Sequence, residues 1–163
     1  MATVNSQLFQ NSAGIETKSD ACIILVKTIW NASFTDELER GCRKVLEENG
    51  VSQIKTLLVP GAVEIPFAIS QHEARSTSFR ANAYIALGCI IKGDTPHFDY
   101  VCQSVTQGIT QLNLSLPVPV IFGVLTVNNE DQVNDRLGGK HGHKGEEAAY
   151  TALKMIDLLN SFQ

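Results

Sequence analysis

The sequence contains no long hydrophobic run, no block of basic residues and no Cys-x-x-Cys pair. Its longest apolar runs, Ala21–Val26 and Val118–Val124, have the length of a strand and fall far short of the roughly 20 residues that a membrane-spanning helix needs. Thirteen basic and seventeen acidic side chains among 163 residues give a formal net charge of −4 at pH 7. We therefore expect a protein that binds neither nucleic acid nor an anionic membrane, since both need a basic surface.

Cysteine is scarce and scattered along the chain. None of Cys22, Cys42, Cys89 and Cys102 lies close to another in sequence, and three of them fall in apolar or amphipathic segments, where a thiol behaves as a small hydrophobic group. A disulfide framework is typical of shorter secreted chains. The N-terminus also lacks the basic and apolar stretches of a secretory signal. These features predict reduced cysteines and a cytoplasmic protein.

The composition is that of a folded domain. Hydrophobic residues make up 44% of the chain and charged residues 18%, a balance that excludes intrinsic disorder. Residues 1–20 are polar and weakly patterned. We expect them to form an N-terminal arm, followed by a single α/β domain over residues 21–163, because one core usually serves a chain of this length.

Beyond residue 20, β-rich apolar runs alternate with segments of helical periodicity. The alternation predicts a four-stranded parallel sheet with right-handed crossovers, in a three-layer α/β/α sandwich of the flavodoxin-like type. The predicted strands are Ala21–Val26, Ile54–Val59, Ala83–Ile91 and Val118–Leu125. The predicted helices run from the capping residue Ser33 to Gly50, from Pro66 towards Glu73, over Phe98–Leu112, near Glu130–Leu137, and from Gly145 to about Leu159.

Ligands of open parallel sheets bind in the loops that follow the carboxyl ends of the strands. In this chain those loops are Lys27–Ser33, Pro60–Ile65, Cys89–His97 and the segment from Thr126 onwards. The third loop joins a Gly-rich turn to a helix N-terminus, and its amides and the Thr95 hydroxyl form a natural cradle for an oxyanion or phosphate. His97 lies in the same cradle and is a candidate acid or base near neutral pH.

Other residues in these loops have two interpretations each. Trp30 is a candidate for stacking on a ligand, although a tryptophan after a buried strand lies more often in the core or in an interface. Glu64 is either functional or only complements a helix dipole. Arg136 and Lys144 suit phosphate binding, but the Gly-rich basic loop between them is of a kind that is more commonly solvated.

The residues present do not support several alternative kinds of site. His141 and His143 form an incomplete ligand set, with no cysteine or acidic cluster nearby, so we expect no metal. His72 lies in a polar helical stretch and is expected at the surface. Gly88–Gly93 matches neither a Walker phosphate loop nor a dinucleotide fingerprint. Lys27–Asn31 follows the first strand where a phosphoacceptor receiver domain would need acidic residues.

Taken together, the loops resemble those of the lumazine synthase family of riboflavin biosynthesis, over about residues 20–160. The matching segments are Ala86–Val101 (Ala-Leu-Gly-Cys-Ile-Ile-Lys-Gly-Asp-Thr-Pro-His-Phe-Asp-Tyr-Val), Val59–Phe67 (Val-Pro-Gly-Ala-Val-Glu-Ile-Pro-Phe), Pro119–Thr126 and Lys144–Ala148. The resemblance implies a transferase that condenses 5-amino-6-(D-ribitylamino)uracil with 3,4-dihydroxy-2-butanone 4-phosphate. The products are 6,7-dimethyl-8-ribityllumazine, phosphate and water, and the family uses neither a metal nor an organic cofactor.

The resemblance also implies roles for particular positions. It gives His97 the role of general acid/base, with Arg136 as phosphate clamp and Lys144 as a basic residue close to the site. Trp30 matches the aromatic residue that stacks on the pyrimidine ring, and Asp94 and Thr95 match the phosphate-side turn. The remaining implied substrate-binding residues are Asn31, Ala62, Val63, Glu64, Cys89, Ile90, Ile91 and Phe122.

For assembly, the resemblance implies a homo-oligomer, either a pentamer or a 60-subunit capsid of twelve pentamers, with active sites shared between chains. It also suggests riboflavin synthase as a partner. The chain departs from several relatives in having Ile29-Trp30-Asn31 for Arg-Phe-Asn, and Gly-Gly-Lys-His-Gly-His over Gly138–His143 for Gly-Thr-Lys-Ala-Gly-Asn. A module that binds lumazines or flavins without turnover and a purely structural shell protein remain alternatives, although the presence of His97 and Arg136 favours the enzyme.

Overall fold

A four-stranded parallel sheet forms the centre of the computed structural model, which describes residues 20–162. The strands are β1 (Cys22–Thr28), β2 (Gln53–Val59), β3 (Ala83–Ile91) and β4 (Val120–Val127), in the spatial order β2-β1-β3-β4. β1 is central, and its Ile23 is in register with Ile54 of β2 and Ala83 of β3. The prediction of four parallel strands is confirmed.

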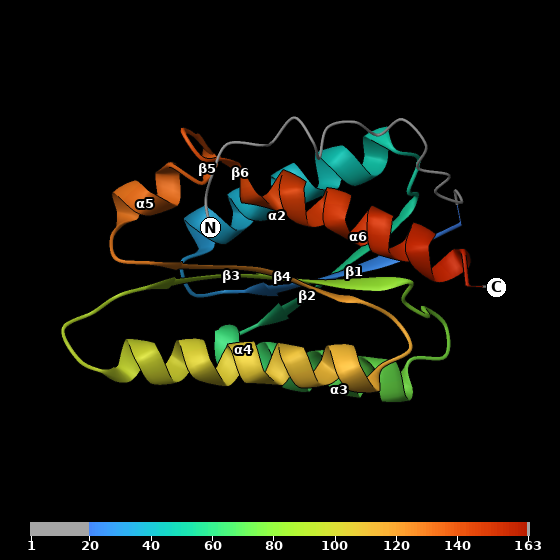
Figure 1. Ribbon diagram of the computed structural model, residues 1–163, viewed down its shortest axis with the longest axis horizontal. Coiled ribbons are helices and arrows are strands. Elements are labelled where there is room, and N and C mark those ends of the chain that lie inside the picture. Colours follow the sequence, from blue (N-terminus) through green and yellow to red (C-terminus); the bar gives the residue numbers. More distant parts are fainter. Residues whose placement is uncertain (1–19, 163) are drawn as a thin grey trace.

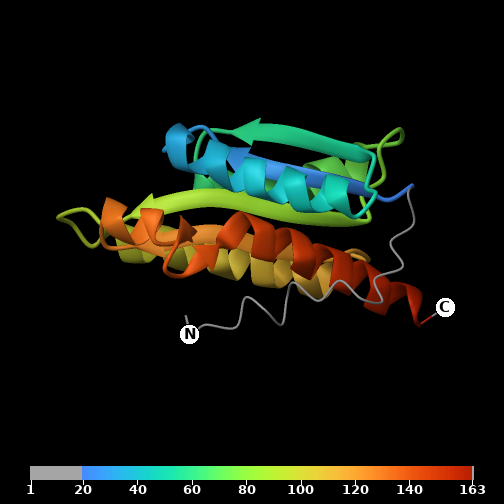
Figure 2. The ribbon, with the colours of Figure 1, turned by 90° about the horizontal axis from the view of Figure 1, so that it is seen from above.

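Helices cover both faces of this sheet (Figure 1). α2 (Ala32–Glu48) and α6 (Lys144–Asn160) lie on one face, and α3 (Ile65–Arg75) and α4 (His97–Ser115) lie on the other. The short η1 (Ala62–Glu64) precedes α3, and α5 (Glu130–Asn134) follows β4. The predicted three-layer, flavodoxin-like arrangement is therefore confirmed, and Figure 2 shows α2 and α6 running in the same direction along their common face.

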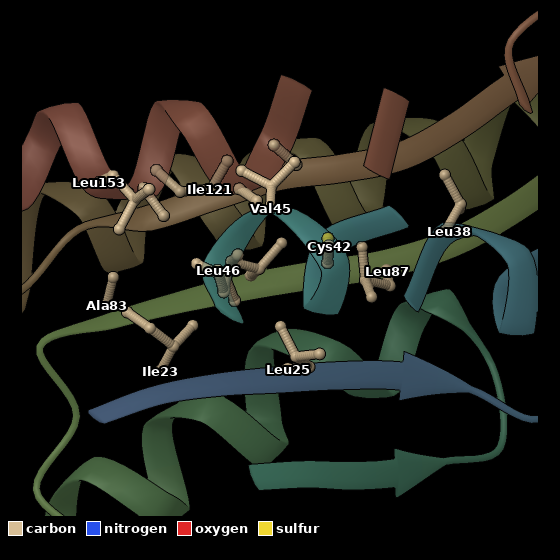
Figure 3. Close-up of a cluster of buried hydrophobic side chains, with 14 of the residues drawn as sticks. Ile23, Leu25, Leu38, Cys42, Val45, Leu46, Ala83, Leu87, Ile121 and Leu153 are labelled. Atoms are coloured by element: carbon tan, nitrogen blue, oxygen red, sulfur yellow. The ribbon is translucent and has the colours of Figure 1, made fainter. Parts of the chain in front are cut away.

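The alternation of side chains along the buried strands divides the core in two. Ile23 and Leu25 point towards α2 and α6, where they pack with Leu46 and Leu153 (Figure 3). Ile24 and Val26 belong to the opposite cluster, against α3 and α4. Because both faces of β1 are covered, a continuous apolar run is the pattern that this strand requires.

Two predicted helix boundaries were wrong. α2 begins at Ala32, and its N-cap is Asn31 in the left-handed conformation (φ 58°), so Ser33 lies inside the helix. The helix predicted up to Leu137 ends at Asn134 and is followed by a hairpin of β5 (Leu137–Gly139) and β6 (Gly142–His143). Gly138 and Gly142 have φ values of 107° and 73°, which other residues rarely adopt, and these two glycines allow the chain to turn within the hairpin.

The structure also bears on several smaller expectations. The proposed N-terminal arm lies outside the described residues, apart from Asp20. Within residues 20–162, no helix combines the length and the apolar character that a bilayer crossing requires. Cys22, Cys42 and Cys89 are buried, and all four cysteines are free thiols, as predicted.

His72 is not the surface residue that its polar neighbours suggested. It is partly buried, its Nδ1 lies 2.8 Å from the hydroxyl of the fully buried Tyr84, and that hydroxyl donates to Glu73 at 2.8 Å. Nδ1 must therefore carry the proton, which leaves Nε2 unprotonated, buried and without a hydrogen-bond partner among the described residues. Desolvation, aided by the positive charge of Lys55, lowers the pKa of His72 below its ordinary 6.5.

We predict that this histidine makes the fold less stable in mild acid. Between the lowered pKa of the folded state and the ordinary value of 6.5, the unfolded chain binds more protons, so the free energy of unfolding falls as the pH drops. His72→Gln keeps a hydrogen-bond donor for Tyr84 but cannot titrate. Urea denaturation at pH 7.5 and 5.5 should show a smaller acid-induced loss for the variant; equal losses would contradict the prediction.

Candidate active site

A cavity of about 470 Å³ opens where the carboxyl ends of β1 and β3 meet the start of α4. Three loops predicted from the sequence contribute to its wall. Its lining residues are Thr28, Trp30, Asn31, Ala62, Val63, Glu64, Cys89, Ile90, Ile91, Gly93, Thr95, His97, Phe98 and Val101. Ten of the predicted site residues are thus brought together by the fold, from segments that are up to about 70 positions apart in the sequence.

The loop after β1 holds Trp30 and Asn31 in a turn that is strained at Asn31 and fixed by hydrogen bonds to two other segments. Asn31 adopts the left-handed conformation, and its Nδ2 donates to the Cys89 carbonyl at 2.8 Å, which ties the loop to the end of β3. The Trp30 amide donates to the Pro60 carbonyl at 3.1 Å. Trp30 is 71% exposed, so the interpretation of this residue as core is excluded, and a large aromatic face is available beside the cavity.

The second loop places a carboxylate next to this aromatic face. Glu64 accepts a hydrogen bond from the Gly61 amide at 2.9 Å through Oε2, which supports its structural interpretation at the start of η1 and α3, and its side chain also lines the cavity. The fit around Gly61 is tight, since a Cβ there would lie 3.0 Å from Cε3 of Trp30 and 3.1 Å from Oε2 of Glu64. The close packing keeps the tryptophan and the carboxylate adjacent.

The third loop supplies the candidate acid/base. His97 is the first residue of α4 and is exposed to solvent at the cavity, with Thr95 two residues before it. Cys89 lines the same cavity, but burial raises the pKa of its thiol to about 11. The thiol is therefore protonated at neutral pH, and of the two side chains His97 is the one suited to proton transfer.

Four predicted site residues lie outside this cavity. Phe122 and Lys144 line a different cavity of about 490 Å³, beside β4 and α6. Arg136 donates through Nη1 to the Gln132 carbonyl at 2.9 Å, and Lys144 lies 2.7 Å from both carboxylate oxygens of Glu147. Asp94 is exposed, although its neighbours Gly93 and Thr95 line the first cavity.

Four residues that line the cavity were not predicted from the sequence: Thr28, Gly93, Phe98 and Val101. The spacing of His97 and Val101 could have identified Val101, since residues four apart share one face of a helix. Thr28 could have been found as the last residue of a strand whose carboxyl end was already suspected. Among residues 20–162, no group of three or more His, Cys, Asp or Glu side chains is arranged to hold a metal ion.

Comparison with known proteins gives a consistent result. The sequence profile described as 6,7-dimethyl-8-ribityllumazine synthase matches residues 20–160. The protein of that name from Bacteroides fragilis is 47% identical over 137 residues, covering 83% of this chain and 94% of that protein. The one from Porphyromonas gingivalis is 51% identical over 135 residues, covering 79% and 80%. The one from Parabacteroides distasonis is 42% identical over 161 residues, covering 97% and 99%.

We predict that the turn at Asn31 is stabilised both by its conformation and by its hydrogen bond. Asn31→Gly keeps the left-handed backbone accessible and loses only the bond to Cys89, whereas Asn31→Ala loses the bond and strains the backbone by about 1–2 kcal/mol. Urea denaturation should therefore show alanine to be less stable than glycine by about 1 kcal/mol. Equal free energies of unfolding for the two variants would show that the conformation at position 31 is not maintained.

Proposed function

Because the chain belongs to the 6,7-dimethyl-8-ribityllumazine synthase family, we infer that it catalyses the formation of 6,7-dimethyl-8-ribityllumazine, a transferase step of riboflavin biosynthesis. The main structural support for this function is the cavity at the carboxyl end of the sheet, which is lined by an exposed aromatic ring, a carboxylate and a histidine. The substrates are 5-amino-6-(D-ribitylamino)uracil and 3,4-dihydroxy-2-butanone 4-phosphate. Formation of the lumazine from purified protein and these two substrates, followed by its absorbance, tests the assignment.

The uracil substrate fits the part of the cavity that is formed by β1, η1 and β3. The exposed face of Trp30 stacks on the pyrimidine ring, and the end of β3, Cys89–Ile91, binds the edge of the ring through backbone groups. Ala62 and Val63 supply the apolar wall. Glu64 accepts hydrogen bonds from the ribityl hydroxyls, and Asn31 lies near the same chain.

The phosphorylated substrate fits the other end, near the start of α4. The amides and hydroxyl of the Asp94–Thr95 turn bind the phosphate at the N-terminal end of a 19-residue helix, where the dipole favours an anion. Arg136 binds it as a fork, and Lys144 adds a second positive charge. His97 lies between the two ends and transfers protons.

The reaction consists of two condensations and one elimination. The uracil's amine attacks the ketone and an imine forms with loss of water, phosphate then leaves, and a second condensation with loss of water closes the ring. Because both substrates bring their own reactive groups, the main contribution of the protein is to orient them. His97 moves protons during imine formation and phosphate departure, and Arg136 with the Asp94–Thr95 amides stabilises the departing phosphate.

The active site is shared between two copies of the chain. Phe122, Arg136 and Lys144 do not line the cavity that contains His97, and Phe122 is 41% exposed on β4, an edge strand of the sheet. A neighbouring chain that presents its β4 edge and its β5–β6 hairpin would add an aromatic ring and two cations to the cavity. Such an arrangement repeats around a ring, in keeping with a cyclic homopentamer.

Three further proposals rest on the family alone or on composition. Twelve pentamers close into a capsid of 60 subunits, and riboflavin synthase associates with it. The protein acts in the cytoplasm, which agrees with its four free thiols. Light scattering distinguishes a monomer of 17.8 kDa, a pentamer and a capsid.

Removing the histidine and the arginine should impair catalysis in different ways. His97→Ala should lower kcat by about 10²–10⁴-fold with little change in KM, because proton transfer contributes in the transition state. Arg136→Ala should chiefly raise the KM for the butanone phosphate. Steady-state kinetics with each substrate varied in turn measure both effects. If Arg136→Ala instead raises the KM for the uracil substrate, the two halves of the site are assigned wrongly.

Sharing of the site predicts that these two impaired variants rescue each other when the butanone phosphate is kept well below the KM of Arg136→Ala. In a mixed oligomer of His97→Ala and Arg136→Ala chains, some sites combine an intact cavity from one chain with an intact arginine from its neighbour. Random mixing at equal amounts should restore about one quarter of the wild-type activity per site. Each variant assembled alone serves as the control. No gain on mixing would mean that the cavity and the arginine of a site come from the same chain.

A further inference from the structure

His143 is held in place between two helices, whereas the hairpin that carries it lies at the surface. Its side chain is only 11% exposed and lies against Gly41 of α2. A Cβ on Gly41 would lie 2.2 Å from Cε1 and 2.5 Å from Nδ1 of the imidazole. Only glycine at position 41 therefore leaves room for this ring, and the pairing of a glycine with a histidine specifies where the hairpin meets α2.

Both ring nitrogens of His143 have partners, one on each helix. The Glu146 amide donates to Nδ1 at 3.3 Å, so the imidazole caps the N-terminus of α6. Nε2 lies 3.2 Å from Oε1 of Glu37 on α2. Since Nδ1 accepts a hydrogen bond, the proton is on Nε2, and the neutral imidazole connects α6 to α2. A hydrogen bond from Arg40, together with one from His143, lowers the pKa of Glu37 and keeps it ionised as the acceptor.

The segment held by His143 is the one that carries both candidate phosphate-binding cations. Lys144 follows it directly, and the Lys144 amide donates to the Arg136 carbonyl at 2.9 Å. His143 itself pairs with Leu137, the residue after Arg136, across the β5–β6 hairpin. A change in the position of the imidazole would therefore move Arg136 and Lys144 together.

We propose that His143 is a positioning residue for phosphate recognition: by bridging Glu37 of α2 and the Glu146 amide of α6, it fixes the hairpin that presents Arg136 and Lys144. It touches no substrate and transfers no proton. The proposal rests on the function proposed above, in which these cations bind the phosphate of the butanone substrate. His141, two residues earlier in the hairpin, has no such bridge among the described residues and provides a matched comparison.

The test compares His143→Ala, His143→Asn and the control His141→Ala. His143→Ala should raise the KM for the butanone phosphate about tenfold, while the KM for the uracil substrate stays within about twofold. Asparagine retains a side-chain acceptor for the Glu146 amide and should recover part of the loss. His141→Ala should behave as the wild type. A purely structural role would affect both substrates alike or lower only the free energy of unfolding, and either result would overturn the proposal.

A phosphate titration and a second pair of variants test His143 independently of turnover and of the folding of His143→Ala. Calorimetric titration with inorganic phosphate needs no turnover, so it tests His143 even if the wild type makes no lumazine and the proposed function is refuted. Phosphate binding about tenfold weaker for His143→Ala than for His141→Ala supports the role of His143. Equal binding by the two variants overturns that role. If His143→Ala does not fold, Glu37→Ala removes the α2 end of the bridge, with Glu47→Ala, at an exposed carboxylate of the same helix, as its control. Only Glu37→Ala should weaken phosphate binding.

Discussion

Helix α2 lies so close to the start of α6 that a side chain fits neither at Gly145 nor at Gly41, which faces His143. A Cβ on Gly145 would lie 2.2 Å from the Leu38 carbonyl oxygen, and one on Gly41 would overlap the ring of His143. The thiol of Cys42 fills the remaining space and donates to the Gly145 carbonyl at 3.0 Å. Because α2 starts directly after Trp30–Asn31 and α6 starts at Lys144, this contact relates the aromatic loop to the hairpin that carries Arg136.

A second set of interactions fixes the start of α2 to the sheet. Lys27, at the carboxyl end of β1, has a side chain that is only 12% exposed and lies 2.6 Å from carboxylate oxygens of both Asp36 and Glu39. Burial opposes the charge of Glu39, but hydrogen bonds from Lys27, Thr56 and Arg43 outweigh it and lower its pKa to about 2. Loss of one partner would leave a partly buried charge uncompensated, so these residues act as a unit that holds α2, and with it Asn31, over the ends of β1 and β2.

These contacts support the proposal that the site is divided between the surfaces of two chains. The cavity with Trp30, Glu64 and His97 lies on loops that are tied down by Asn31 and Gly61. The cations Arg136 and Lys144 lie on a hairpin that is tied down by His143. Each half is held by its own contacts, so the association of two chains proposed above would complete the site without reorganising either half, which is the condition for catalysis by orientation.

The sequence alone predicted the four parallel strands and the main helices, and its resemblance to the family supplied most of the ten cavity residues. Hydrophobic periodicity and the rule that sites follow strand ends depend only on local pattern, and they located Trp30, Glu64 and His97 before any coordinates. The folded structure was needed to show that Phe122, Arg136 and Lys144 lie outside that cavity, that residues 137–143 form a hairpin, and that His72 and His143 are hydrogen-bonded and partly buried. The physical reason is that these features depend on contacts between distant segments: His143 is 106 positions from Glu37, and local pattern does not encode which helix a loop side chain will meet.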